Sequence, residues 1–257
     1  MEKILRDIGK EAIDFLNELK GKEGIDKIIG RHGDDTTRVV DKKSEDYIFE
    51  LLRNTGYKFL FVSEESGTIN ENNYDYIAVI DPLDGSTNFI NGIPWSSVSI
   101  ALYKNNEKNF IRSYAGVVAN IFSKEIYTYY NGKSYINGNI VENVRPKSNI
   151  VLAYFGKKEI DKAYQILKKL EGFKIRTLGS SSLDMILICT GKAYFYFDIR
   201  DKIRNVDVAA STGFCSSLKI YPFNSRNEII TSSLESVDVI GEIMLTYDEE
   251  LKKRLFL

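Results

Sequence analysis

The chain has 257 residues, with 35 Lys and Arg against 36 Asp and Glu, and it contains one His and two Cys. This length predicts one large domain or two closely packed domains. The balanced charge argues against nucleic acid as a partner, because nucleic-acid-binding surfaces are strongly basic. No apolar run approaches the roughly 18 residues of a membrane span, and the N-terminus lacks the apolar block of a signal peptide. We therefore expect a cytoplasmic protein that binds neither membranes nor nucleic acid.

The scarcity of His and Cys excludes several kinds of active site. A Ser-His-Asp triad would need His32, and a zinc site made of His or Cys side chains would lack ligands. Cys189 and Cys215 lie in apolar stretches, so we expect separate, reduced thiols buried as small hydrophobic side chains. An enzyme of this composition would depend on carboxylates, hydroxyls, Lys and Arg, and hard metal ions.

The first half of the chain predicts helices followed by an antiparallel sheet. Apolar residues recur at helical spacing from Ile4 to Leu19, which indicates an amphipathic helix ending near Gly21. The other elements expected here are a loop or irregular hairpin at 24–41, a helix at 42–54, strands at 59–62 and 76–80, and an antiparallel sheet at 95–130 continued by 135–138.

The second half alternates strand and helix patterns, which predicts an α/β unit with parallel strands. The expected strands are 150–154, 173–176, 193–197 and 218–221, and the expected helices are 159–170, 180–190, 206–215 and 237–253. Asn, Pro and Ser accumulate near residues 140–148. We therefore divide the chain into an N-terminal α+β half, 1–145, and a C-terminal α/β half, 146–257.

The segment from Asp81 to Phe89, with the sequence DPLDGSTNF, directly follows an apolar strand. Asp-Pro and Asp-Gly are common in turns, which explains the turn but not the density of polar groups. Asp81, Asp84 and the Leu83 carbonyl could converge there, and such oxygen ligands suit Mg²⁺ or Ca²⁺. Residues after Gly85 could begin a helix whose N–H groups hold a phosphate.

Other acids follow predicted strands or begin predicted helices. Glu64 and Glu65 end the strand before Asp81, and adjacent parallel strands would bring these acids together, although two adjacent Glu are also typical of a solvated turn. Asp207 precedes small residues, where an acid near a helix N-terminus is common. Asp41, taken alone, is typical of the N-cap of the next helix.

These blocks together resemble the inositol monophosphatase/fructose-1,6-bisphosphatase superfamily of metal-dependent, often lithium-sensitive phosphatases. Ser-Glu64-Glu65-Ser, Asp81–Phe89 and Val-Asp207-Val-Ala-Ala resemble the family patterns (G)EE(S), DPxDGTxNF and WDxAA in the same order. The segments 33–41 and 197–202 look closest to archaeal members, which often hydrolyse both inositol monophosphate and fructose 1,6-bisphosphate.

The sequence departs from the family patterns at several positions. Ser86 replaces a Thr but keeps the hydroxyl, whereas Val206 and Ser211 replace a Trp and a Gly and look like packing changes. Arg200 stands where dedicated inositol monophosphatases have an acid that contacts inositol hydroxyls. A strict inositol specificity is therefore not expected, and an Arg instead suits a second phosphate.

The resemblance implies a layered αβαβα sandwich of the sugar-phosphatase type, with the site between the two halves and a homodimer as the usual assembly. It implies two or three Mg²⁺ ions, with Mn²⁺ as an alternative, and direct in-line attack of a metal-activated water on a small phosphate ester. The implied metal ligands are Glu64, Asp81, Leu83, Asp84 and Asp207. The implied catalytic residues are Asp41, Glu65 and Ser86, and the implied substrate contacts are Asp84, Gly85, Ser86, Arg176, Ser181 and Arg200.

Two alternatives remain open at this point. One is a 3′-phosphoadenosine 5′-phosphate or NADP(H) phosphatase of the same superfamily, which would need a pocket for a nucleotide base. The other is a non-catalytic phosphosugar-binding protein, which would be expected to have lost a ligand such as Asp84 or a water-activating group such as Ser86. Both residues are present in the sequence.

Overall fold

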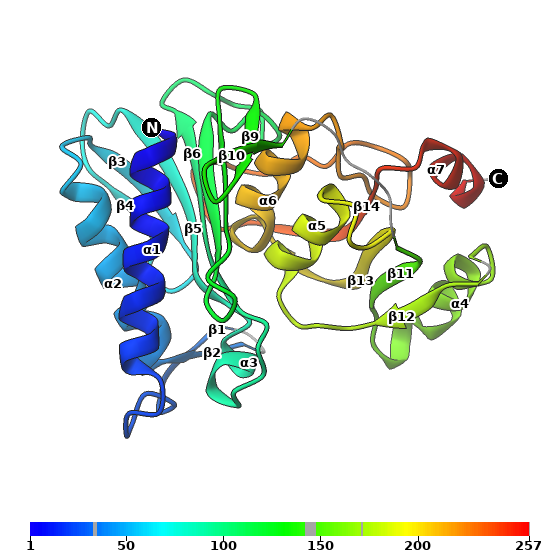
Figure 1. The fold of residues 1–257 in the computed structure, drawn as a ribbon, viewed down its shortest axis with the longest axis horizontal. Coiled ribbons are helices and arrows are strands. Elements are labelled where there is room, and N and C mark those ends of the chain that lie inside the picture. The colour runs from blue at the N-terminus through cyan, green and yellow to red at the C-terminus, as the bar shows by residue number, and fades with distance from the viewer. Residues whose placement is uncertain (33–34, 142–147, 171, 257) are drawn as a thin grey trace.

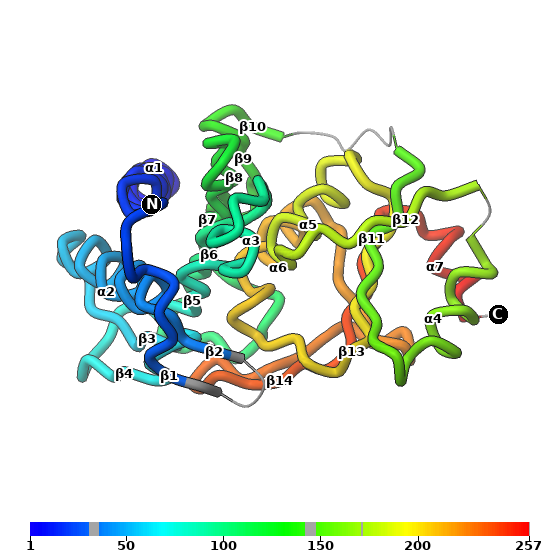
Figure 2. The backbone as a smooth tube through the Cα atoms, turned by 90° about the horizontal axis from the view of Figure 1, so that it is seen from below, coloured from blue at the N-terminus to red at the C-terminus, as the bar shows by residue number. Residues whose placement is uncertain are grey.

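The computed structural model describes residues 1–32, 35–141, 148–170 and 172–256. Its elements stack in layers of helices and sheets, as Figures 1 and 2 show from two directions. Three clusters of buried apolar side chains hold the described residues of these layers together. Helices α1 (Glu2–Leu19) and α2 (Val39–Arg53) cover one face of a large sheet. Helices α5 (Ser181–Cys189) and α6 (Asn205–Ser217) lie between that sheet and a smaller one. The expected αβαβα sandwich is confirmed.

In the described part of the chain, the large sheet has eight strands in the order β10-β9-β8-β7-β6-β5-β3-β4, and a separate hairpin, β1 with β2, precedes α2. Among the described strands of this sheet, β3 and β5 form the single parallel pair, as expected for the two strands that are followed by acids. The bounds are β1 (Ile28–His32), β2 (Asp35–Arg38), β3 (Phe59–Ser63), β4 (Gly67–Asn70), β5 (Tyr76–Asp84), β6 (Ser97–Lys104), β7 (Ala115–Asn120), β8 (Ile126–Tyr130), β9 (Lys133–Ile136) and β10 (Asn139–Val141), with the short helix α3 (Ser86–Ile90) after β5.

The small sheet has the order β12-β11-β13-β14, and its outer face is covered by α4 and α7. Strand β11 pairs in parallel with β12 and β13, whereas β14 is antiparallel to β13. The bounds are β11 (Ile150–Tyr154), a 3₁₀ turn (Lys157–Glu159), α4 (Ile160–Leu167), β12 (Lys174–Arg176), β13 (Phe195–Arg204), β14 (Val239–Thr246) and α7 (Glu249–Leu255).

Two predicted elements near the C-terminus are wrong. Residues 218–221 form no strand, because the chain turns at Lys219 with a φ of 63°. The predicted helix 237–253 is strand β14 followed by α7. Asp248 separates the two elements, since its Oδ1 accepts the N–H groups of Glu250 and Leu251 and so begins the helix. The predicted boundary between the halves falls on 142–147, outside the described residues.

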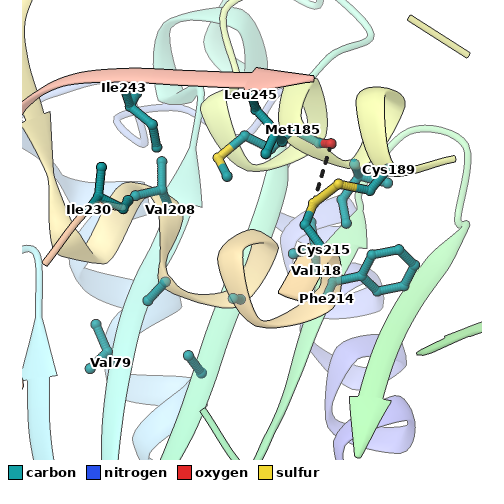
Figure 3. Close-up of a cluster of buried hydrophobic side chains, with 14 of the residues drawn as sticks. Val79, Val118, Met185, Cys189, Val208, Phe214, Cys215, Ile230, Ile243 and Leu245 are labelled. Carbon is teal, nitrogen blue, oxygen red and sulfur yellow. Dashed lines mark hydrogen bonds between the residues drawn. A yellow bond between two sulfur atoms is a disulfide. The ribbon is translucent and has the colours of Figure 1, made fainter. Parts of the chain in front are cut away.

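Cys189 and Cys215 are both fully buried, as expected, but they are joined in a disulfide rather than held as separate thiols (Figure 3). Helices α5 and α6 pack side by side, which brings Cα atoms 26 residues apart in sequence to 5.4 Å. The expectation of reduced thiols considered the apolar surroundings of each Cys alone, whereas the packing of the two helices decides the pairing. No helix of the described residues is long and apolar enough to cross a bilayer.

Candidate active site

A bulge at the end of β5 places two acids on one face of the sheet. Asp81 pairs with Ser99 of β6 and Asp84 with Ser97, so three steps along β5 match two steps along β6. In a regular strand, the side chains of residues three apart point to opposite faces of the sheet. The extra residue of the bulge turns the Asp84 side chain to the same face as that of Asp81. The Leu83 N–H donates to Asp81 Oδ1 at 3.0 Å, which closes the turn. The bulge and this turn together explain why Asp81 and Asp84 converge.

Strand β3 brings Glu64 to the same place. Its N–H donates to the Ile80 carbonyl of the parallel strand β5 at 3.2 Å, so Glu64 lies beside Asp81. Burial raises the pKa of Glu64, and the charge of Arg204 opposes the shift. Glu65 turns instead toward the hairpin, where it accepts a short hydrogen bond from the Thr37 hydroxyl.

Asp41 and Asp207 occupy equivalent positions, because each is the third residue of its helix. Asp41 Oδ2 accepts the Arg38 N–H at 2.7 Å, and Asp207 Oδ2 accepts the Arg204 N–H at 2.8 Å. Asp41 is therefore not the N-cap, since α2 begins at Val39. The second oxygens differ, because Asp207 Oδ1 lies 3.3 Å from Arg204 Nη2. Asp41 Oδ1 is buried and makes no hydrogen bond with any described residue, so it is suited to a water molecule or a cation.

The start of α5 holds Asp84 in place. Ser180 Oγ and the Ser182 N–H donate to Asp84 Oδ2 at 2.6 and 2.8 Å, and the Ser181 N–H donates to Oδ1 at 3.2 Å. Only Ser181 was predicted as a site residue. The run of three Ser after Gly179 is a helix-start signal, but the sequence alone does not show that Asp84 lies against it.

The acids line a cleft of about 290 Å³ between the two halves. Of the substrate contacts predicted from the sequence, Asp84, Gly85, Ser86, Ser181 and Arg200 also line it. Arg176 does not, because it is exposed at the end of β12 and its guanidinium donates to the Ile175 carbonyl. Asp41 and Glu65 are not among the described residues that line the cleft, but in addition to burial the charges of Glu65 and Glu64 help to raise the pKa of Asp41.

The acids stand in an environment that disfavours their negative charge. Burial, and then the charges of Glu64, Asp84 and Asp207, raise the pKa of Asp81 well above its ordinary value. Burial also raises the pKa of Asp84 and of Asp207 to about 6, and that of Asp41 to about 7. Such a cluster needs a positive charge to hold several carboxylates ionised together.

The donor set suits a hard divalent cation. Acidic residues from both halves line the same cleft together with Leu83, and Mg²⁺ prefers carboxylate and carbonyl oxygens as ligands. Within the described residues, no three acidic, His or Cys side chains stand close enough to enclose an ion in their present positions. Arg204 lies between Glu64 and Asp207 instead, so the carboxylates would have to shift to bind an ion.

Arg200 is held at the edge of the cleft by residues that the sequence did not single out. Its guanidinium donates to both oxygens of the buried Asp198, with Nη2 at 2.5 Å from Oδ2. It also lies over the Tyr154 ring, 4.8 Å from the centroid. The remaining donors of such a planar guanidinium suit an anion in the cleft.

Glu45 and Asp184 are buried acids that sequence reasoning missed. Glu45 accepts the Ser66 N–H at 3.0 Å and pairs with Lys42 at 2.8 Å, which braces the turn after Glu64 and Glu65. Asp184 accepts from Trp95 Nε1 at 2.8 Å and from the Tyr154 hydroxyl at 2.5 Å. Glu45 sits within helix α2 and Asp184 within α5, where an acid ordinarily faces solvent, so no local signal marks either residue.

Comparisons with known proteins agree with this geometry. A sequence model of the inositol monophosphatase family matches residues 1–213. The chain is 32% identical over 254 residues to a fructose-1,6-bisphosphatase/inositol-1-monophosphatase of Methanocaldococcus jannaschii, covering 96% of this chain and 94% of that one. It is similar in structure to a crystallised inositol monophosphatase-fructose 1,6-bisphosphatase, with a TM-score of 0.82, 29% identity and coverage of 98% and 97%. A Pyrococcus horikoshii protein described as similar to inositol-1 monophosphatase gives a TM-score of 0.81 at 27% identity, covering 99% and 98%.

Proposed function

Because the chain belongs to the inositol monophosphatase family, we propose that it is a Mg²⁺-dependent phosphomonoesterase acting on inositol 1-phosphate, fructose 1,6-bisphosphate or both. The observation that carries this proposal is the meeting of Glu64, Asp81, Asp84 and Asp207 in one cleft that also contains Arg200. Four carboxylates would repel a phosphate ester unless cations lay between them and the ester.

Mg²⁺ or Mn²⁺, when bound, would supply positive charge beside the ester and a lower pKa for a bound water. Glu64, Asp81, Asp84, Asp207 and the Leu83 carbonyl would hold the ions. Ser86, Asp41 and Glu65 would orient the water and take its proton, and the unpartnered Asp41 Oδ1 supports that role. Attack would be in line with the departing oxygen and would form no phosphoenzyme.

The remaining contacts concern the ester. The N–H groups of Gly85 and Ser86 would hold phosphate oxygens as negative charge develops. Ser181, which borders the cleft, would contact the sugar, and Arg200 would bind a second phosphate. Arg176 would require a substrate that extends beyond the cleft, so we give it no part in the reaction.

The reaction is tested by following phosphate release from inositol 1-phosphate and fructose 1,6-bisphosphate with Mg²⁺ and with EDTA. We expect EDTA to abolish release and Asp84→Asn to lower kcat by at least about a hundredfold. Asp161→Asn, the same change at an exposed position of α4, is the matched control and should leave kcat unchanged. Activity that survives both EDTA and Asp84→Asn would contradict the metal mechanism.

The same assay separates the alternatives. A clear preference for 3′-phosphoadenosine 5′-phosphate or NADP(H) would replace the proposed substrates, and no release from any ester would favour a non-catalytic phosphosugar-binding protein. A homodimer, implied by the family resemblance, and a cytoplasmic location, expected from the sequence composition, are also part of the proposal. The mass of the protein in solution tests the dimer.

A further inference from the structure

Arg204 lies inside the acidic cluster rather than at its edge. It is the last residue of β13, and its Nη2 is 2.5 Å from Glu64 Oε1 and 3.3 Å from Asp207 Oδ1. Its backbone N–H also donates to Asp207 Oδ2 at 2.8 Å. The guanidinium thus joins an acid of the N-terminal half to an acid of the C-terminal half, and all three side chains are largely buried.

The two oxygens that Arg204 contacts are ones that a metal ion would need. A divalent ion such as Mg²⁺ binds carboxylate oxygens at about 2.0–2.1 Å in a nearly octahedral arrangement. A guanidinium nitrogen already seated between Glu64 Oε1 and Asp207 Oδ1 takes the same space and the same lone pairs. Because an Arg side chain stays protonated in proteins, deprotonation does not release these oxygens.

We propose that Arg204 is a tethered cation of the metal-free site, which holds Glu64 and Asp207 together and must leave them before a divalent ion can bind there. This inference rests on the proposed metal-dependent function. Arg204 would stabilise the metal-free protein by offsetting carboxylate repulsion between the two halves. It would also weaken the affinity for the ion by competing for its ligands.

The two effects have opposite signs, which makes the inference testable without activity. Metal-free wild-type and Arg204→Gln proteins are compared by isothermal titration with Mg²⁺ and by thermal unfolding, near pH 8 and without substrate. We expect Arg204→Gln to bind Mg²⁺ at least about tenfold more tightly, as for loss of a close competing charge. We also expect its metal-free form to unfold at a lower temperature than wild type.

Two further variants are controls for charge and for folding. Arg200→Gln removes a positive charge from the same strand and cleft, but its partner is Asp198, so its Mg²⁺ affinity should stay within about twofold of wild type. Arg204→Lys keeps the charge on a shorter donor and should bind Mg²⁺ with an affinity between wild type and Arg204→Gln. If metal-free Arg204→Gln does not fold, the Mg²⁺ affinity of Arg204→Lys tests the inference instead.

The inference is overturned if Arg204→Gln, or Arg204→Lys in its place, binds Mg²⁺ with unchanged or weaker affinity. A raised KM for the ester at unchanged Mg²⁺ affinity would also overturn it, because Arg204 would then serve the substrate. Tighter Mg²⁺ binding by a protein that hydrolyses no ester would uphold the inference while contradicting the proposed function. The two failures can therefore be told apart.

Discussion

At the scale of single residues, Gly85 has a backbone conformation that other residues rarely adopt. Its φ is 83°, and a Cβ built there would lie 2.8 Å from the Gly179 carbonyl oxygen and 3.1 Å from that of Trp95. The close approach lets the turn after Asp84 pack against the start of α5. This explains why a glycine follows the second acid of the motif.

Gly85→Ala should destabilise the protein by about 2–4 kcal/mol and lower kcat, because the added methyl group pushes the turn away from α5. Gly92→Ala is the matched control, since Gly92 also has a positive φ, 69°, but no described residue lies within 4 Å of a Cβ built there. Gly92→Ala should lower the free energy of unfolding only by the strain of a left-handed alanine, about 1–2 kcal/mol. Urea unfolding and phosphate release measure both effects, and equal losses in the two variants would contradict the steric argument.

Arg200 is the residue expected to distinguish a bisphosphate from a monophosphate. Arg200→Ala should raise KM for fructose 1,6-bisphosphate by roughly 10–100-fold more than KM for inositol 1-phosphate, because a charge-assisted bond to the second phosphate is lost. Steady-state kinetics with both substrates measures the difference. Equal changes for the two esters would argue against this role.

The Arg200 experiment needs a companion variant. Asp198 is buried, and removal of its cation leaves an uncompensated carboxylate that itself destabilises the protein. The double variant Arg200→Ala/Asp198→Asn removes that charge as well. Its substrate preference should match the single variant, while its stability should be higher.

At the scale of elements, the pair α5 and α6 supplies the C-terminal half of the cleft. The start of α5 binds Asp84, and α6 carries Asp207. The Ser182 hydroxyl donates to the Asp207 carbonyl at 2.8 Å, which joins the two helix starts. The Cys189–Cys215 disulfide joins the same two helices within the core (Figure 3).

The disulfide should stabilise the oxidised protein by about 3–4 kcal/mol, because it closes a loop between residues 26 apart in the unfolded chain. The double variant Cys189→Ala/Cys215→Ala should therefore unfold at lower denaturant concentration. Wild type with a thiol reductant should approach the same midpoint. Two results together would contradict the pairing: free thiols in untreated wild type after denaturation, and an unfolding midpoint that does not change when the reductant is added.

At the scale of the whole molecule, polar contacts join the two halves in addition to the shared core. Asp184 of the C-terminal half accepts a hydrogen bond from Trp95 of the N-terminal half. Burial raises the Asp184 pKa to about 8, although the bonds from Tyr154 and Trp95 oppose the shift. The folded protein thus binds a proton that the unfolded chain, with a pKa of about 3.9, releases.

This linkage predicts the sign of a pH effect. Because Asp184 has a higher pKa in the folded protein than in the unfolded chain, proton binding to Asp184 favours the folded state at low pH. This stabilisation is lost as pH rises from about 4 through about 8. The free energy of unfolding of wild type should therefore fall relative to that of Asp184→Asn as pH increases over this window. Urea unfolding of both metal-free proteins near pH 5, 7 and 9 measures it, and a constant difference would contradict the raised pKa.

Prediction from the sequence succeeded where local patterns determine structure. The apolar face from Ile4 to Leu19 specifies α1, and the apolar strands before Glu64 and Asp81 specify the parallel pair β3 and β5. It failed at 218–221 and 237–253, where short apolar runs fit more than one element. Strand β14 is a strand because β13 offers it an edge to pair with.

The residue types of the candidate site follow from the sequence alone: acids in three ordered motifs, Gly85 directly after Asp84, and no His or Cys set that could replace the acids. Only the tertiary structure decided how those groups meet. The β5 bulge turns Asp84 to the face of Asp81, α5 supplies donors to Asp84, and Arg204 reaches Glu64 across 140 positions of sequence. The reason is physical, since residue types and local periodicity follow from neighbours along the chain, whereas these contacts depend on packing between distant segments.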